Sequence, residues 1–134
     1  MVSWNDSLVI GVPQIDDQHR ELVNRLDELM QATRQGKGHT EVEKTLRFIV
    51  SYVKEHFETE EKLQAEVNYP DLATHKKLHI DFGYTAVELV QDFQKNGIDS
   101  DLTAKINKVL VQWLIRHIRT EDKKIAVYIN DLQK

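Results

Sequence analysis

The sequence has 134 residues, of which 40% are hydrophobic and 30% charged, and its formal net charge is -4 at pH 7. This length predicts a single domain, residues 1–134, that can bury a core, and the dispersed charges argue against nucleic acid and anionic membranes as partners. The absence of cysteine excludes disulfides, thiolate metal sites and cysteine nucleophiles.

The chain is expected to begin with an extended arm, followed by helices. The arm precedes residue 16, is predicted to lie across the rest of the protein, and carries the apolar residues Trp4, Leu8, Val9, Ile10 and Val12. The first predicted helix covers about 17–35, because apolar residues recur there at helical spacing, and Gly36 and Gly38 end it.

Two further helices are predicted in the middle of the chain. The second opens at Thr40, where Glu43 three residues later matches a capping box, and it stops at Tyr69-Pro70-Asp71. Pro70 suits the first turn of the third helix. That helix is predicted over about 71–95, and Asn96-Gly97 ends it.

The fourth helix is predicted to start near Ser100, and the segment after Asp122 stays amphipathic, so that the helix continues or restarts there. Four amphipathic helices with short connections pack most simply as an antiparallel up-down bundle. The predicted fold class is therefore all-α: a four-helix bundle with an extended N-terminal arm and a short C-terminal helical extension.

Ionisable residues interrupt the apolar stripes of these helices. They are His19, His56, Glu60, His75, His79 and His117, whereas His39 lies in a break. A single histidine on an apolar face is more often a hydrogen-bonded core residue than a ligand. Five histidines and a glutamate cannot readily satisfy one another, because each neutral imidazole offers one donor and one acceptor, and a buried carboxylate is costly unless it is paired or binds a metal. The pattern therefore predicts a metal cluster.

The spacing leaves one ligand open. His56 and Glu60, and likewise His75 and His79, are four residues apart and so share a helix face. On the fourth helix, Glu121 follows His117 at the regular spacing of four, whereas Asp122 follows at five. Asp122 points inward only if the helix loosens or bulges after His117.

Ordered blocks along nearly the whole chain resemble the hemerythrin family, specifically its single-domain bacterial members, the bacteriohemerythrins. The blocks are Trp4, Gly11-Val12, Ile15-Asp16-Asp17-Gln18-His19, His56-Phe57-Glu58-Thr59-Glu60-Glu61, Tyr69-Pro70, His75 with His79, and Trp113-Leu114-Ile115-Arg116-His117 with Asp122. One departure is Gln64, where many relatives have Met, and this difference bears on the polarity around the site.

The resemblance implies a particular ligand set. The aspartate that is the last ligand in the family corresponds to Asp122. Glu121 is then expected to be exposed or to contact a ligand rather than the metal. The cofactor it implies is a pair of iron ions with an oxo or hydroxo bridge. One iron is bound by His75, His79 and His117, the other by His19 and His56, and Glu60 and Asp122 bridge the two.

Coordination arithmetic agrees with oxygen binding. Two six-coordinate metals offer about twelve positions, and five histidines, two bridging carboxylates and one bridging oxygen leave one position, at the ion with two histidines. The predicted function is reversible dioxygen binding for storage, transport or scavenging, without enzymatic activity. The resemblance places Leu114 close to bound oxygen, and Phe57 and Trp113 wall the pocket or are ordinary core.

Two other functions are compatible with these residues: a sensing module for oxygen, redox state or nitric oxide, and a diiron oxidoreductase. The expected partners are dioxygen and an oxygen-consuming enzyme. We expect a monomer, and a cytoplasmic one, since the first residues carry no signal-peptide pattern and no apolar run approaches the ~20 residues of a membrane-spanning helix.

Overall fold

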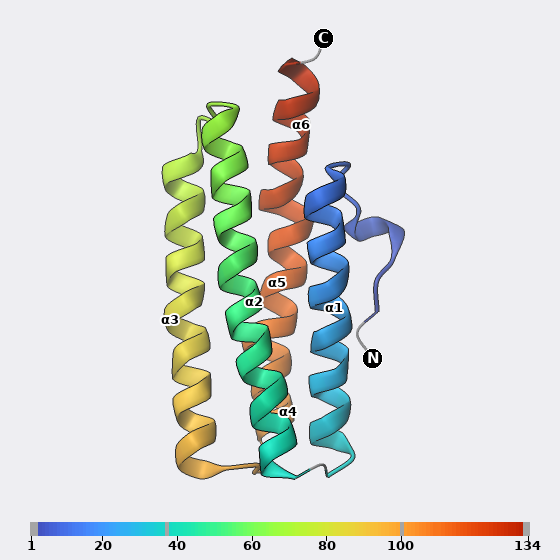
Figure 1. Cartoon of the computed structure of the whole chain (residues 1–134), viewed down its shortest axis with the longest axis vertical. Coiled ribbons are helices and arrows are strands. Elements are labelled where there is room, and N and C mark those ends of the chain that lie inside the picture. Colours follow the sequence, from blue (N-terminus) through green and yellow to red (C-terminus); the bar gives the residue numbers. More distant parts are fainter. Residues whose placement is uncertain (1–2, 37, 100, 133–134) are drawn as a thin grey trace.

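The computed structural model describes residues 3–36, 38–99 and 101–132, and these form helices without any strand. Four long helical rods lie side by side, and successive rods run in opposite directions (Figure 1). The first three rods are α1 (Pro13–Arg34), α2 (His39–Glu66) and α3 (Leu72–Asn96). The fourth rod is built from α4 (Leu102–Ile106), η2 (Asn107–Val111), α5 (Gln112–His117), η3 (Ile118–Asp122) and α6 (Lys123–Leu132). The predicted all-α bundle is therefore confirmed.

The core of the bundle comes from the apolar stripes of all four rods. Its largest fully buried members include Leu22, Leu26, Leu46, Ile49, Phe82, Phe93, Ile106 and Leu110. Burial of each such side chain contributes about 1.5–3 kcal/mol relative to exposure. This core fills one end of the bundle and supports the polar layer that lies next to it.

The N-terminal arm is shorter than predicted, because α1 begins at Pro13 rather than near residue 17. Proline is favoured in the first helical turn, where its missing N–H costs nothing. The buried carboxylate of Asp16 accepts hydrogen bonds from the backbone N–H groups of Ile10 (2.8 Å) and Gly11 (3.1 Å). The arm was predicted to be extended throughout, but it contains one short 3-10 turn, η1 (Asp6–Leu8).

Only part of the arm's apolar surface faces the bundle. Leu8 and Ile10 are buried in a second core cluster with Ile15, Val23, Ile118 and Ala126, and Trp4 and Val12 pack against it. Val9 is 41% exposed and points away from this cluster. The arm therefore covers the outer side of α1 and η3 next to the polar layer.

The predicted capping box at the start of the second helix is wrong. α2 begins at His39, Gly38 occupies the cap position, and no side chain caps the helix. The carboxylate of Glu43 instead pairs with Arg47 at 2.9 Å, one turn further along the helix. The i,i+4 ion pair thus takes the carboxylate that the capping box would have used.

The fourth rod contains two π-helical turns, η2 and η3, in an otherwise α-helical chain. The bulge after His117 was anticipated as the condition for an inward Asp122, whereas η2 was not predicted. In α5, which follows η2, Leu114 is 2% exposed while the neighbouring Trp113 is only half-buried. The predicted start near Ser100 lies outside the described residues, and the first helical residue after it is Leu102.

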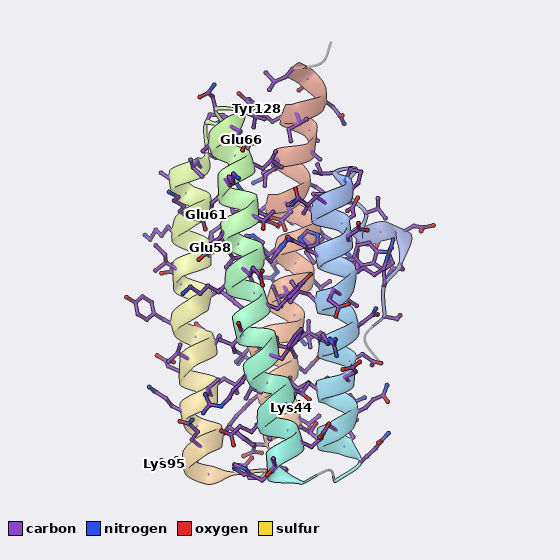
Figure 2. The ribbon with its side chains drawn as sticks, viewed as in Figure 1. Lys44, Glu58, Glu61, Glu66, Lys95 and Tyr128 are labelled. Atoms are coloured by element: carbon purple, nitrogen blue, oxygen red, sulfur yellow. The ribbon has the colours of Figure 1, made fainter. Side chains whose placement is uncertain are left out.

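The C-terminal extension continues directly from η3 as α6. Near its end, the hydroxyl of Tyr128 lies 3.0 Å from the carbonyl oxygens of Val67 and Asn68, just past α2 (Figure 2). Asn68 has a positive φ of 54°, and the hydrogen bond holds this tight connection to α3.

Among the described residues, no helix combines the length and hydrophobicity that a bilayer crossing requires.

Candidate metal centre

Seven ionisable side chains from all four rods converge in the polar layer. They are His19 from α1, His56 and Glu60 from α2, His75 and His79 from α3, His117 from α5 and Asp122 from η3. None is more than 5% exposed. These are the seven ligand candidates of the sequence analysis, and the structure brings all of them together.

The five histidines form two groups that share the carboxylates. The Nε2 atom of His117 lies 3.1 Å from that of His75 and 3.2 Å from that of His79. On the other side, the rings of His19 and His56 have their centroids 4.5 Å apart. Within each group, with Glu60 and Asp122 included, one ligand atom per residue lies within 4.8 Å of every other.

Glu60 directs one carboxylate oxygen to each histidine group. Its Oε1 lies 2.8 Å from His56 Nε2 and 3.2 Å from His19 Nε2. Its Oε2 lies 3.3 Å from His75 Nε2 and 3.4 Å from His79 Nε2. This is the arrangement of a carboxylate that can bridge two cations.

Asp122 repeats this arrangement from the fourth rod. Its Oδ2 lies 3.0 Å from His19 Nε2, and its Oδ1 lies 3.2 Å from both His75 and His117. The π-helical turn η3 brings residues five apart onto one face, so that Asp122 and His117 both point inward. Glu121 lies nearer the surface and pairs with Lys124 at 3.2 Å.

Two hydrogen bonds behind the histidines were missed by sequence reasoning. His56 donates through Nδ1 to Gln18 Oε1 at 2.6 Å, and His79 donates through Nδ1 to Glu61 Oε2 at 2.8 Å. Figure 2 shows Glu61 on the side of α2 next to α3. A donated Nδ1–H leaves the Nε2 lone pair free to face the centre. The sequence offered one indication of these two partners, because each is adjacent in the chain to a ligand candidate: Gln18 precedes His19 and Glu61 follows Glu60.

The close carboxylates control protonation in the metal-free cluster. Burial lowers the pKa of His19 and of His75, but hydrogen bonds to Asp122 and Glu60 outweigh burial and raise each to about 9. Burial and the charge of Glu60 raise the pKa of Asp122, but hydrogen bonds from His117, His19 and His75 outweigh them and bring it to about 2. For Glu60, burial is outweighed by His56 and the other imidazoles, and its pKa lies well below the ordinary value.

The seven side chains are better suited to bind a pair of cations than to satisfy one another's hydrogen-bonding groups. Glu60 Oε2 and both carboxylate oxygens of Asp122 are buried against imidazole Nε2 atoms at 3.0–3.4 Å, and these contacts have poor hydrogen-bond geometry. Three Nε2 atoms that face one another cannot all be satisfied, because each imidazole nitrogen either donates or accepts. Imidazole and carboxylate ligands without thiolate suit iron, manganese or zinc, and a crowded set favours coordination numbers above four.

Aromatic rings cover one side of the centre. Phe57 stacks on the His79 ring with centroids 3.7 Å apart, and Trp113 stacks on His117 at 4.6 Å. Leu114 is buried in the same core cluster as Phe57. The three predicted pocket residues therefore belong to the apolar layer on the core side of the polar cluster.

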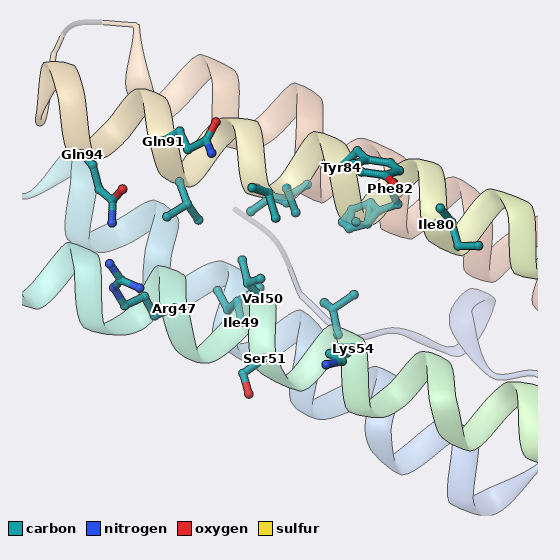
Figure 3. Close-up of a pocket in the computed structure, with 16 residues that line it drawn as sticks. Arg47, Ile49, Val50, Ser51, Lys54, Ile80, Phe82, Tyr84, Gln91 and Gln94 are labelled. Atoms are coloured by element: carbon teal, nitrogen blue, oxygen red, sulfur yellow. The ribbon is translucent and has the colours of Figure 1, made fainter.

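A surface groove of about 740 Å³ lies between α2 and α3, away from the centre (Figure 3). Its walls are mainly apolar and include Val50, Ile80 and Tyr84, and none of the seven ligand candidates lines it. Phe82 also lines the groove, and its ring stacks on Trp113 with centroids 4.2 Å apart. The aromatic layer thus separates the groove from the histidines.

Comparisons with known proteins agree with this geometry. The family model described as "Hemerythrin HHE cation binding domain" matches residues 10–129. The bacteriohemerythrin of Stenotrophomonas maltophilia (strain R551-3) is 32% identical over 126 residues, which cover 94% of this chain and 80% of that protein. A bacteriohemerythrin of Pseudomonas aeruginosa (strain LESB58) is 33% identical over 89% of this chain and 75% of its own length. The myohemerythrin of Theromyzon tessulatum is 26% identical over 90% of this chain and 88% of its own.

Proposed function

This chain belongs to the hemerythrin family, and from that premise we propose that it binds dioxygen reversibly at a non-haem diiron centre. The observation that carries the proposal is the pair of carboxylates, Glu60 and Asp122, each with one oxygen toward each histidine group. We also propose that residues 1–134 form one domain, since the family model matches most of them.

The proposed ligand assignment follows the two histidine groups. His75, His79 and His117 would hold one iron and His19 and His56 the other, and the carboxylates of Glu60 and Asp122 could serve both. Iron, when bound, supplies the reversible redox chemistry that dioxygen binding requires. The site with two histidines has fewer protein ligands, and it is therefore the proposed place of dioxygen binding.

The protein's own residues favour binding over further reaction. Five imidazoles are neutral ligands and add no negative charge, whereas carboxylate-rich sites stabilise highly oxidised metal. Gln18 and Glu61 fix the orientation of two imidazoles through their Nδ1–H groups. Phe57, Trp113 and Leu114 form the proposed pocket wall, which keeps water and protons away from bound oxygen.

The test is an oxygen cycle on the reconstituted protein. Metal-free protein is loaded anaerobically with ferrous iron, and absorption spectra are recorded in nitrogen, in air and again in nitrogen. We expect new visible bands in air that disappear when oxygen is removed, over several cycles. Irreversible oxidation in the first cycle would contradict the proposal. Rapid multiple turnover of peroxide or nitric oxide, or a partner bound only in air, would instead support an enzyme or a sensor.

A further inference from the structure

Gln64 is a fully buried amide that has no hydrogen-bond partner. Its relative exposure is 0%, and neither Oε1 nor Nε2 contacts a donor or acceptor among the residues that the structure describes. Leaving a buried polar group unpaired destabilises the folded protein, and such groups in native proteins nearly always have a partner or an ordered water. The amide therefore calls for a partner close by.

The face of α2 that carries Gln64 is the face toward α3. Phe57 and Glu61 both contact His79 of α3, by ring stacking and by a hydrogen bond. Gln64 follows Phe57 by seven residues and Glu61 by three, so all three share one side of the helix. Leu63, by contrast, packs in the cluster that α1 and the arm share.

The contacts between α2 and α3 set a register in which we expect Gln64 to lie at the level of His75. Glu60 Oε2 contacts both His75 and His79 at 3.3 and 3.4 Å, and Gln64 lies one turn beyond Glu60, at the end where α3 begins. Side chains on a helix lean toward its N-terminus. Because α2 and α3 run in opposite directions (Figure 1), this rule leads us to expect that the Gln64 amide leans toward the centre and the His75 ring toward Gln64.

Among the ligand candidates, His19 on α1 and His75 on α3 each have a buried Nδ1 without a hydrogen-bond partner, and His75 is the one on the helix that the Gln64 side of α2 faces. The Nε2 of His75 faces Glu60 and Asp122, and its Nδ1 is buried with no hydrogen-bond partner. His56 and His79, by comparison, donate their Nδ1–H groups to Gln18 and Glu61. His75 is thus a ligand candidate that lacks the supporting acceptor that two of its neighbours possess.

We propose that Gln64 is a positioning residue, whose Oε1 accepts a hydrogen bond from the Nδ1–H of His75 through one buried water. This bond fixes the ring so that Nε2 faces the centre, as Gln18 and Glu61 do for His56 and His79. The inference deepens the proposed diiron function and rests on it for the effect on iron. The hydrogen bond itself is a property of the metal-free protein as well.

The test replaces Gln64 by methionine, which keeps the length and volume of the side chain and removes the acceptor. In the metal-free protein, the proposal predicts a solvent-protected Nδ1–H signal of His75 in ¹H–¹⁵N spectra that disappears in Gln64→Met, and a lower urea midpoint of the variant. If Gln64 had no partner, methionine would remove an unpaired buried amide and the midpoint would rise. That rise, or an unchanged His75 signal, would overturn the proposal.

Iron binding supplies an independent measurement. Gln64→Met is expected to weaken iron affinity about 10–100-fold in a chelator competition, the usual cost of losing a hydrogen bond behind a ligand. Gln18→Met is the matched positive control, because it removes the acceptor seen on His56. A loss for Gln18→Met with none for Gln64→Met would overturn the role of Gln64. Wild-type protein that binds no iron would instead refute the proposed function, and the His75 signal would still test the hydrogen bond.

Discussion

The Nδ1 of His79 and the Oε2 of Glu61 lie 2.8 Å apart, and this hydrogen bond joins the candidate metal centre to the surface of α2. Glu61→Ala removes the acceptor, so that the His79 ring can rotate and present its nitrogens differently. We expect iron affinity to fall about 10–100-fold, as measured by competition with a chelator. Glu58→Ala, an exposed change on the same helix, is the control and should leave affinity unchanged. Equal affinities for the two variants would show that the bond has no part in iron binding.

Asp122 and Glu121 offer a direct comparison of two adjacent acids. Asp122→Ala removes the carboxylate that faces both histidine groups, and we expect the iron content after reconstitution to fall below that of the wild type by one ion or more. Glu121→Ala removes an acid that pairs with Lys124, and iron content should not change. Iron is quantified per folded chain, with circular dichroism as the check of folding. The reverse result would mean that the acid at the regular spacing of four is the ligand.

The metal-free protein should be most stable at mildly acidic pH. His19 and His75 have pKa values raised to about 9, so their contribution to the free energy of unfolding is complete below the unfolded pKa of about 6.5 and is lost as pH rises through 9. Asp122, with its pKa lowered to about 2, contributes above its unfolded pKa of about 3.9 and loses this contribution as pH falls through 2.

The measurement is the urea midpoint between pH 4 and pH 10. We expect a plateau from about pH 4 to 6.5 and a fall from there to pH 9 and above. A midpoint that rises between pH 6.5 and 9 would contradict the assigned protonation of the two histidines.

Asp16 should stabilise the arm rather than the metal centre. Asp16→Ala leaves the backbone N–H groups of Ile10 and Gly11 without their acceptor, and we expect the free energy of unfolding to fall by about 1–3 kcal/mol. Asp17→Ala is the neighbouring control, because its side chain is 76% exposed and its contact with Arg20 is long, at 3.8 Å. Urea denaturation of both variants measures the difference, and similar values for the two would exclude an anchoring role for Asp16.

The bundle and its ligand candidates were predictable because polar residues on apolar stripes are rare and informative. Six of the seven residues that meet in the centre lie at the regular spacing of an α-helix, so periodicity alone found them. Asp122 does not lie at that spacing, because a π-helical turn brings it inward. Spacing alone could not decide between Asp122 and Glu121 as the ligand. The turn depends on packing between the rods, which a one-dimensional pattern does not contain.

Other features depended on tertiary contacts and were missed or mistaken. Gln18 and Glu61 gained their roles from histidines on other helices, 38 and 18 residues away in the chain. α1 begins at Pro13, and Asp16 in its first turn accepts hydrogen bonds from the backbone of the arm, a contact that the apolar pattern did not indicate. The expected cap at Thr40 is absent because α2 already begins at His39, which places Thr40 inside the first turn.

The most direct test of the diiron centre is anomalous diffraction at the iron edge from crystals of protein loaded with ferrous iron. We expect two peaks inside the bundle, one against His75, His79 and His117 and the other against His19 and His56, with Glu60 and Asp122 touching both. A single peak, or iron bound anywhere outside these seven side chains, would contradict the account.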